Sequence, residues 1–137
     1  MVSALAFSQI TDQMKQAFKT DDPELLINEL KNQKLSINDC FELEEKTYSL
    51  FAIAIKMDKQ KIFSKLINQK ADLNKICEDK SPLMFAAKYG KSAMVKQLIE
   101  AGANADLRNS KSANAFYYAQ KYKQKEIEDY LISRIQK

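Results

Sequence analysis

Residues 81–90, Ser-Pro-Leu-Met-Phe-Ala-Ala-Lys-Tyr-Gly, decide the fold, because related stretches recur on both sides of them. Residues 49–55 align with them at a shift of 32 residues, and residues 114–120 align at a shift of 33. A fourth, divergent copy is found over residues 16–38. Self-similarity at such a period is typical of stacked repeats, in which each repeat is one supersecondary unit. The sequence therefore predicts a repeat protein.

Each repeat predicts a helix, a tight turn and a second helix. In the third repeat Ser81 can cap the first helix, Pro82 suits its first position, and Gly90 ends it. The second helices carry an apolar pair followed four residues later by another, which places both pairs on one helical face. These pairs are residues 62–63 with 66–67, 94–95 with 98–99 and, less closely, 127–128 with 131–132.

The residues that end the helices carry a further signal. Gly102 follows the second helix of the third repeat, a position that often needs a left-handed backbone. In the second repeat Asp58 and Lys70 stand where Gly90 and Gly102 stand in the third. Because a left-handed backbone is costly for residues with a Cβ, we expect the second repeat to lose some local stability.

The third repeat resembles the ankyrin repeat, whose pattern runs T-P-L-H-x-A-A-x-x-G-H and then L-L-x-x-G-A-D. Residues 81–90 carry this resemblance, followed by Val95, the pair 98–99 and residues 102–104. The match is partial over residues 45–76 and 110–137 and weak over the first repeat. Met84 and Lys91 replace the two histidines of the pattern. The resemblance implies that the loss of the first histidine removes a hydrogen-bonding group between repeats, so we expect a less regular stack.

The resemblance implies an all-α fold, an ankyrin-repeat solenoid of about four helix-turn-helix units with degenerate capping repeats at both ends. We expect one domain over residues 1–137, with approximate repeats at 8–40, 41–76, 77–109 and 110–137. On the first helix we expect a buried stripe of Phe7, Ile10, Met14 and Phe18. Residues 72–74 and 104–106 read as turns between repeats, not as calcium ligands.

The composition excludes much catalytic chemistry. The chain has no His, so Ser-His-Asp and Cys-His mechanisms and histidine zinc sites are absent. Two glycines cannot build a phosphate-cradling loop, so we expect no nucleotide, cofactor or metal and no enzyme activity. Cys40 and Cys77 form no CxxC pair and are expected to be reduced, packed thiols, with a single disulfide or a reactive thiol as the alternatives. The paired acids 21–22 and 44–45 are expected at turns or helix starts.

Charge and hydropathy indicate the kind of partner. The net charge is +4, and all 22 basic residues except Arg108 and Arg134 are Lys. Nucleic-acid readers favour Arg and denser basic clusters, so an acidic protein surface is the favoured partner.

The longest apolar runs are too short to span a membrane, which predicts a soluble protein. Residues 1–7 lack the features of a secretion signal, so we expect a cytoplasmic location, with periplasmic or secreted as alternatives if the true start lies upstream.

The ends of the first helices supply the candidate binding residues. The resemblance places these ends side by side on a concave face, where lysine recurs in every repeat. Tyr favours interfaces because it brings contact area at low entropic cost. The predicted partner-binding residues are Lys19, Lys56, Met57, Lys88, Tyr89, Lys121 and Tyr122, with Tyr48, Lys80 and Lys111 on the fingers between repeats. The alternative is that these lysines are ordinary solvated residues.

The expected function is a non-catalytic protein–protein interaction module that is a monomer on its own and binds an acidic partner. The resemblance implies a stoichiometric inhibitor or an adaptor, since small freestanding ankyrin-like proteins act as either. An inhibitor is the first hypothesis, such as an immunity protein that neutralises a toxin. The alternatives are an adaptor or accessory subunit that stabilises a larger complex, and a secreted ankyrin-type effector that acts on host proteins. We expect no small-molecule substrate.

Overall fold

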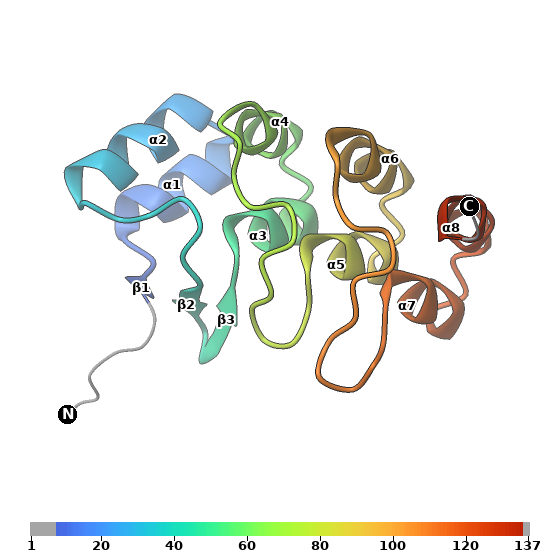
Figure 1. The fold of residues 1–137 in the computed structure, drawn as a ribbon. Helices are drawn as coiled ribbons and strands as arrows, with labels where there is room; N and C mark the ends of the chain where they lie inside the picture. The colour runs from blue at the N-terminus through green and yellow to red at the C-terminus, as the bar shows by residue number, and fades with distance from the viewer. Residues whose placement is uncertain (1–7, 136–137) are drawn as a thin grey trace. The chain divides into compact units, whose positions relative to one another are not determined.

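The computed structural model describes residues 8–135 and divides the chain into two compact units, residues 1–71 and 72–137. Each unit contains two helix pairs (Figure 1). The helices of unit 1 are α1 (Asp12–Thr20), α2 (Pro23–Asn32), α3 (Leu50–Met57) and α4 (Gln60–Asn68). Those of unit 2 are α5 (Pro82–Lys88), α6 (Ser92–Ala101), α7 (Ala115–Lys121) and α8 (Lys125–Ile135). The expected mostly helical fold is confirmed.

The core of unit 1 comes from the apolar faces of its four helices. Met14 and Phe18 of α1 are buried, as are Leu26 and Leu30 of α2. One detail differs from the expected stripe, because α1 begins at Asp12 and Ile10 precedes it. Phe7 lies outside the described residues. Helix α3 is apolar on nearly every side, and its residues from Leu50 to Ile55 are all buried.

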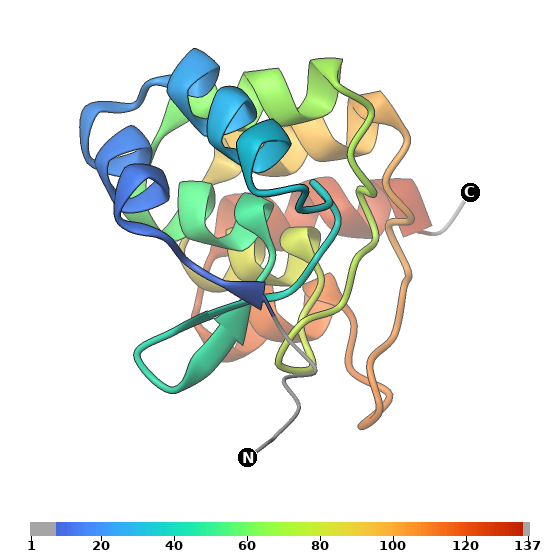
Figure 2. The same cartoon turned by 90° about the vertical axis from the view of Figure 1, so that its left-hand side faces the viewer.

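A small sheet in unit 1 was not expected from the sequence. Strand β2 (Phe41–Leu43) pairs with β1 (Ser8–Gln9) in parallel and with β3 (Lys46–Tyr48) in antiparallel register (Figure 2). Glu44 and Glu45 form the turn between β2 and β3, both with positive φ, at 54° and 68°. Turns of this type suit the twist of a hairpin but favour Asn and Gly. The prediction that these acids lie in a turn is confirmed.

Aspartates tie the ends of neighbouring helices together in unit 1. Asp21 ends α1 in a left-handed conformation, and Asp22 caps α2 by accepting the Leu25 N–H at 3.1 Å. The Asp21 carboxylate accepts the Lys61 and Ile62 N–H groups at 3.1 and 2.9 Å. These groups lie in the first turn of α4, whose own capping residue provides no side-chain hydrogen bond. Asp21 therefore supplies the cap that α4 lacks, and anions are favoured at that end of a helix.

The predicted left-handed positions are confirmed. Asp58 and Lys70 have φ of 60°, Gly90 has 70° and Gly102 has 111°. Gly90 also accommodates a close approach, since a Cβ built there would lie 2.7 Å from the side-chain Oε1 of Gln124. The Gln124 amide group donates to the Lys88 carbonyl at 3.5 Å. The backbone angle therefore favours glycine at position 90, and a Cβ there would also displace the end of the Gln124 side chain.

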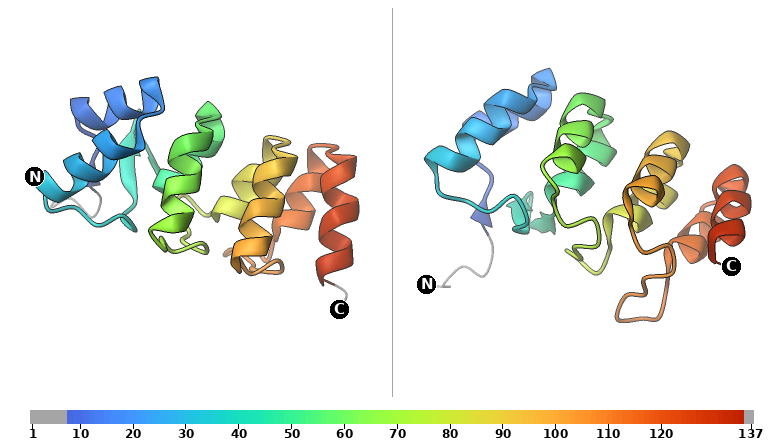
Figure 3. Two further views of the ribbon diagram at one scale, coloured as in Figure 1. Left: turned by 90° about the horizontal axis from the view of Figure 1, so that it is seen from above. Right: turned by 45° about the horizontal axis from the view of Figure 1, so that its top comes forward.

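In unit 2 the first helices α5 and α7 pack on each other, and each also packs on its own second helix, as both views of Figure 3 show for α7 and α8. Ser81 caps α5 as predicted, by accepting the Met84 N–H at 3.2 Å. The Met84 sulfur accepts the Ser81 N–H at 3.5 Å. Sulfur is a weak acceptor, so Met84 completes a capping box with Ser81 in weakened form.

The expectation that the two cysteines are reduced thiols is wrong. Cys40 and Cys77 are both disulfide-bonded, and neither is a free thiol. Spacing gave no sign of this, because a disulfide depends on which loops the fold brings together and not on separation along the chain. Within the described residues, no helix has the length and apolar character needed to cross a membrane.

Candidate functional site

A lysine lies in the last turn of every first helix. Lys19 lies in the last turn of α1, Lys56 in that of α3, Lys88 in that of α5 and Lys121 in that of α7. Each cation complements the negative end of its helix dipole, which contributes to local stability. Each lysine therefore lies near the end of its helix, as predicted. Whether it can also bind a partner depends on the side chains around it.

In unit 2 the lysines alternate with aromatic rings. The Lys88 Nζ lies 5.5 Å from the ring centroids of both Tyr89 and Tyr122. The Lys121 Nζ lies 5.7 Å from the ring of Tyr122 and 5.9 Å from that of Tyr117. Tyr122 is thus shared by two cations. The structure brings together these four residues predicted from the sequence, and adds Tyr117.

A third lysine closes this series into a loop of contacts. The Lys80 Nζ lies 5.8 Å from the rings of both Phe85 and Tyr118. Tyr118 meets Tyr117 edge to face at 5.3 Å, and Phe85 stacks on Tyr89 at 6.2 Å. We call the eight side chains the lysine–aromatic cluster, namely Lys80, Phe85, Lys88, Tyr89, Tyr117, Tyr118, Lys121 and Tyr122. Each cation–ring contact of this kind contributes about 0.5–1 kcal/mol at an exposed site.

The electrostatics of the lysine–aromatic cluster favour an anionic ligand. Partial burial lowers the pKa of the Lys80 ammonium, and the positive charge of Lys88 lowers it further. Asp79 and Glu78 oppose that effect only in part. A cation that is partly removed from water and near another cation gains stability when an anion approaches.

The lysine–aromatic cluster also exposes apolar surface. The tyrosines 89, 117 and 122 are 38%, 46% and 40% exposed. By contrast, Tyr118 and Phe85 are buried and form the base of the cluster. Tyrosines held by neighbouring cations lose little freedom on binding, which is the property that makes this residue common at protein interfaces.

A loop beside the cluster, residues 109–113, is fixed by the buried side chain of Asn109. Its Oδ1 accepts the N–H groups of Lys111 and Ala113 at 2.9 and 3.0 Å. Its Nδ2 donates to the Asp79 carbonyl at 2.9 Å and to the Tyr118 hydroxyl at 3.1 Å. The loop is therefore joined both to the turn at residues 77–80 and to the cluster.

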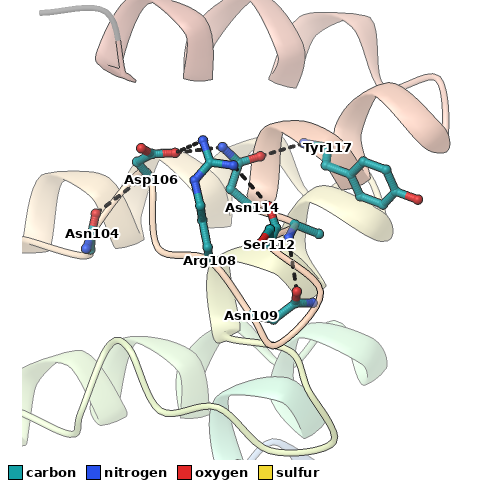
Figure 4. Close-up of polar contacts among 8 residues, drawn as sticks. Asn104, Asp106, Arg108, Asn109, Ser112, Asn114 and Tyr117 are labelled. Carbon is teal, nitrogen blue, oxygen red and sulfur yellow. Dashed lines mark hydrogen bonds and ion pairs between the residues drawn. The ribbon is translucent and has the colours of Figure 1, made fainter.

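The stem of the same loop is held by polar contacts that Figure 4 shows. Asp106 accepts from Asn114 at 2.7 Å and from Arg108 at 3.0 Å. Arg108 also donates to the Ser112 carbonyl at 3.0 Å, and Asn114 caps α7 by accepting the Tyr117 N–H at 2.9 Å. The loop and the start of α7 are thus one connected structure. Residues 72–74 and 104–106 form turns, as predicted.

The turn at residues 77–80 contributes a second connection. The Asp79 carboxylate accepts the Ser110 N–H at 3.1 Å and the Ser110 hydroxyl at 2.9 Å. These two donors, the N–H first, hold the pKa of the Asp79 carboxyl below its ordinary value, and Lys111 and Lys80 add to this effect. Burial raises the pKa of the Tyr118 phenol, and its hydrogen bond to Asn109 acts in the opposite direction.

A hollow of about 250 Å³ lies between this loop and α7. We call it the 109–113 hollow. It is lined by Lys111, Ser112, Ala113, Tyr117, Tyr118 and Lys121. Lys111, predicted as a finger residue, is exposed at its rim, and Lys80, the other finger lysine of this unit, lies in the lysine–aromatic cluster.

In unit 1 the predicted residues have a different arrangement. Tyr48 is only 7% exposed, so it is not the exposed finger residue that was expected. Lys56 donates to its hydroxyl at 3.2 Å. Met57 is 43% exposed and, with Tyr48 and Lys56, lines a largely apolar hollow of about 270 Å³. Lys19 is exposed, and its carbonyl accepts from Lys59 at 3.3 Å.

Sequence reasoning missed three members of the lysine–aromatic cluster: Phe85, Tyr117 and Tyr118. They belong to the apolar positions of the repeat, where a core role is the simpler interpretation. The available signal was the doubled tyrosine at residues 117–118, since adjacent positions of a helix cannot both face the core. Within residues 8–135 no group of three or more acidic, Cys or His side chains could hold a metal ion.

Helix pairs joined by tight turns, with loops projecting between successive pairs, define a helical repeat protein. A family model of ankyrin repeats, in three copies, matches residues 50–137. The chain belongs to the ankyrin-repeat family, as its sequence indicated. Ankyrin repeats are protein–protein interaction modules, and the family is typically non-catalytic. The first helix pair, α1 and α2, lies outside the matched residues, and a search of curated proteins found no match to the chain.

Proposed function

We propose that this protein binds an acidic partner protein through the lysine–aromatic cluster of unit 2. The observation that carries the proposal is the unbroken alternation of cations and rings, in which Lys88 and Lys121 share Tyr122. The contacts hold the charges in fixed positions before a partner arrives. Preformed charges attract and orient an acidic surface, and the exposed tyrosines supply contact area that loses water on binding.

The form of interaction that we propose is one-to-one inhibition, as by an immunity protein that neutralises a toxin. The exposed large apolar side chains of the described residues are interspersed with charged ones, such as Tyr89 and Tyr122 with Lys88 and Lys121. A permanent accessory subunit needs a larger and more apolar contact surface. A mixed surface instead suits a protein that is stable alone and binds its target on demand.

The disulfide-bonded state of Cys40 and Cys77 supports a location in an oxidising compartment. Disulfides persist in the periplasm and outside cells and are rare in the cytosol. We therefore favour the periplasmic or secreted alternative over the cytoplasmic one.

The test of the binding proposal is capture from native lysate. The wild type, a Lys88→Gln, Lys121→Gln double variant and a control double variant, Lys96→Gln, Lys125→Gln, are immobilised in parallel. The control removes two charges from α6 and α8, where the lysines form exposed ion pairs with Glu126 and Asp129. Circular dichroism establishes that all three proteins are folded to the same extent.

The proposal predicts that wild type and control retain the same acidic protein at near-equal stoichiometry and that the first variant loses it. Equal capture by all three proteins would contradict it. The enzymatic or toxic activity of the captured protein, assayed with and without the chain, then separates an inhibitor from an accessory subunit. Inhibition lowers that activity, and an accessory subunit raises or maintains it.

A further inference from the structure

We infer that the 109–113 hollow receives one acidic side chain of the partner, an Asp or Glu whose carboxylate lies between the ammonium groups of Lys111 and Lys121. This inference rests on the proposed binding function and names the anchor residue that gives it specificity. The lysine–aromatic cluster orients an acidic surface in general, whereas a hollow with two cations at its rim selects the position of one carboxylate.

The shape of the 109–113 hollow suits a single side chain. Its volume is about 250 Å³, and its base is formed by the buried residues Ala113 and Tyr118. Its walls are the exposed side chains of Lys111, Tyr117 and Lys121. The apolar base contacts the methylene stem of an acidic residue, and the rim provides the donors for its carboxylate. Anchor residues of protein interfaces commonly fill such local depressions.

The charge of the lining favours a carboxylate. The two charged residues of the 109–113 hollow are both lysines. The nearby carboxylate of Asp79 already accepts two hydrogen bonds from Ser110. Charge-assisted hydrogen bonds from ammonium groups to a carboxylate are short and strong, and two of them fix its orientation.

The wall of the 109–113 hollow is held in place before binding. Asn109 accepts from the backbone of both Lys111 and Ala113, and it donates to Tyr118. The Lys121 ammonium is held between the rings of Tyr117 and Tyr122. Binding therefore requires little ordering of the loop, which lowers its entropic cost.

The experiment uses the full chain labelled with ¹⁵N and three probes: acetyl-(Gly-Glu)₃-amide, its glutamine analogue acetyl-(Gly-Gln)₃-amide, and inorganic phosphate. Amide shifts are followed during titration of the wild type and of single variants Lys111→Gln, Lys88→Gln and Lys96→Gln. Lys96 is the matched control, because its Nζ also lies over a tyrosine ring, 5.7 Å from that of Tyr130, but on α6. The amide spectra show directly whether each variant is folded.

The inference predicts that the glutamate peptide shifts the amides of residues 109–121 and that the glutamine peptide does not. Lys111→Gln should lower the affinity for the glutamate peptide about fivefold, as expected for the loss of one favourable exposed ion pair. Lys96→Gln should leave this affinity unchanged. Weakening by Lys88→Gln without weakening by Lys111→Gln would overturn the inference and leave the proposed function intact.

Two further outcomes are decisive. If the glutamate peptide shifts no amide of unit 2 in the wild type, the inference and the proposed binding mode fail together. If inorganic phosphate shifts residues 109–121 at lower concentration than the glutamate peptide, the 109–113 hollow is an inorganic anion site, and the inference of a carboxylate anchor is overturned.

Discussion

Individual residues in left-handed conformations mark where this chain departs from a regular repeat. Lys70 and Gly102 occupy equivalent positions after α4 and α6, both with positive φ. The repeat period alone located both positions, and Gly102 showed what the backbone requires there. The Asp21 carboxylate that caps α4 could not be predicted, because its partners lie some 40 positions further along the chain.

Replacing Lys70 with glycine should stabilise the protein. Glycine adopts the φ of 60° found at Lys70 without steric cost, so we expect a gain of about 1 kcal/mol. Urea unfolding followed by circular dichroism measures the change. Lys70→Ala keeps the Cβ and the strain, so it should give no such gain. A similar gain from alanine would show that loss of the charge is responsible.

Replacing Gly90 with alanine should destabilise the protein. Alanine would keep the left-handed φ of 70°, which costs about 1–2 kcal/mol for a residue with a Cβ, so we expect a loss of this size. Its Cβ would also displace the Gln124 Oε1, 2.7 Å away, at a smaller cost because that group ends a flexible side chain. Thermal unfolding of Gly90→Ala in the wild type and in a Gln124→Ala background separates the two causes. The loss should be smaller in that background, where only the backbone cost remains. Equal losses would exclude a role for the contact.

At the scale of elements, helices were predictable and strands were not. Apolar pairs spaced by four residues, with Ser81 and Pro82 at a start and glycines at the ends, define the helix pairs of the third repeat. Strands β1, β2 and β3 have only two or three residues, too few to show an alternating pattern. They form because the chain before α1 pairs with a hairpin that begins about 30 residues later.

The connection between the 77–80 turn and the 109–113 loop depends on pH. The Ser110 donors lower the pKa of Asp79 in the folded state, so this carboxylate stabilises the fold above the ordinary Asp pKa of about 3.9. That stability is lost as the pH falls through the lower, folded-state pKa. Ser110→Ala removes the hydroxyl donor and keeps the N–H donor, so it should raise the Asp79 pKa part of the way to its ordinary value and destabilise the protein at pH 7. The difference from the wild type should shrink below about pH 4.

Carbon-detected NMR titration of the Asp79 carboxyl and urea unfolding at several pH values test this prediction. Ser92→Ala is the control, because that hydroxyl donates to Glu126 on α8 instead. The control should leave the Asp79 pKa unchanged. A Ser110→Ala variant with an unchanged Asp79 pKa would contradict the contribution assigned to the Ser110 hydroxyl.

At the scale of the whole molecule, the sequence predicted the site residues that lie at equivalent positions of repeated helices. It did not predict the part of the site that is formed by irregular loops. Helical spacing located Lys88, Tyr89, Lys121 and Tyr122, and the structure brings these four together. The 109–113 hollow depends on the Asn109 side chain and on the conformation of an irregular loop, for which no sequence period exists. The disulfide-bonded state of the cysteines was missed for the same reason.

The oxidation state of the cysteines gives a prediction for the intact protein. Iodoacetamide should modify neither Cys40 nor Cys77 in protein from its native source when no reductant is present. After reduction under denaturing conditions both should react, with the mass increase of two carbamidomethyl groups. Full modification without reduction would contradict the disulfide-bonded state and remove the support for an oxidising compartment.

The composition of the lysine–aromatic cluster gives this protein an optical reporter of its own. The chain has no Trp and six Tyr, and four of these tyrosines, at positions 89, 117, 118 and 122, belong to the cluster. Its ultraviolet emission therefore comes largely from the rings that a partner would cover. A tryptophan-free ligand could be titrated against the unlabelled protein, with the change in tyrosine fluorescence recording occupancy of the cluster in real time.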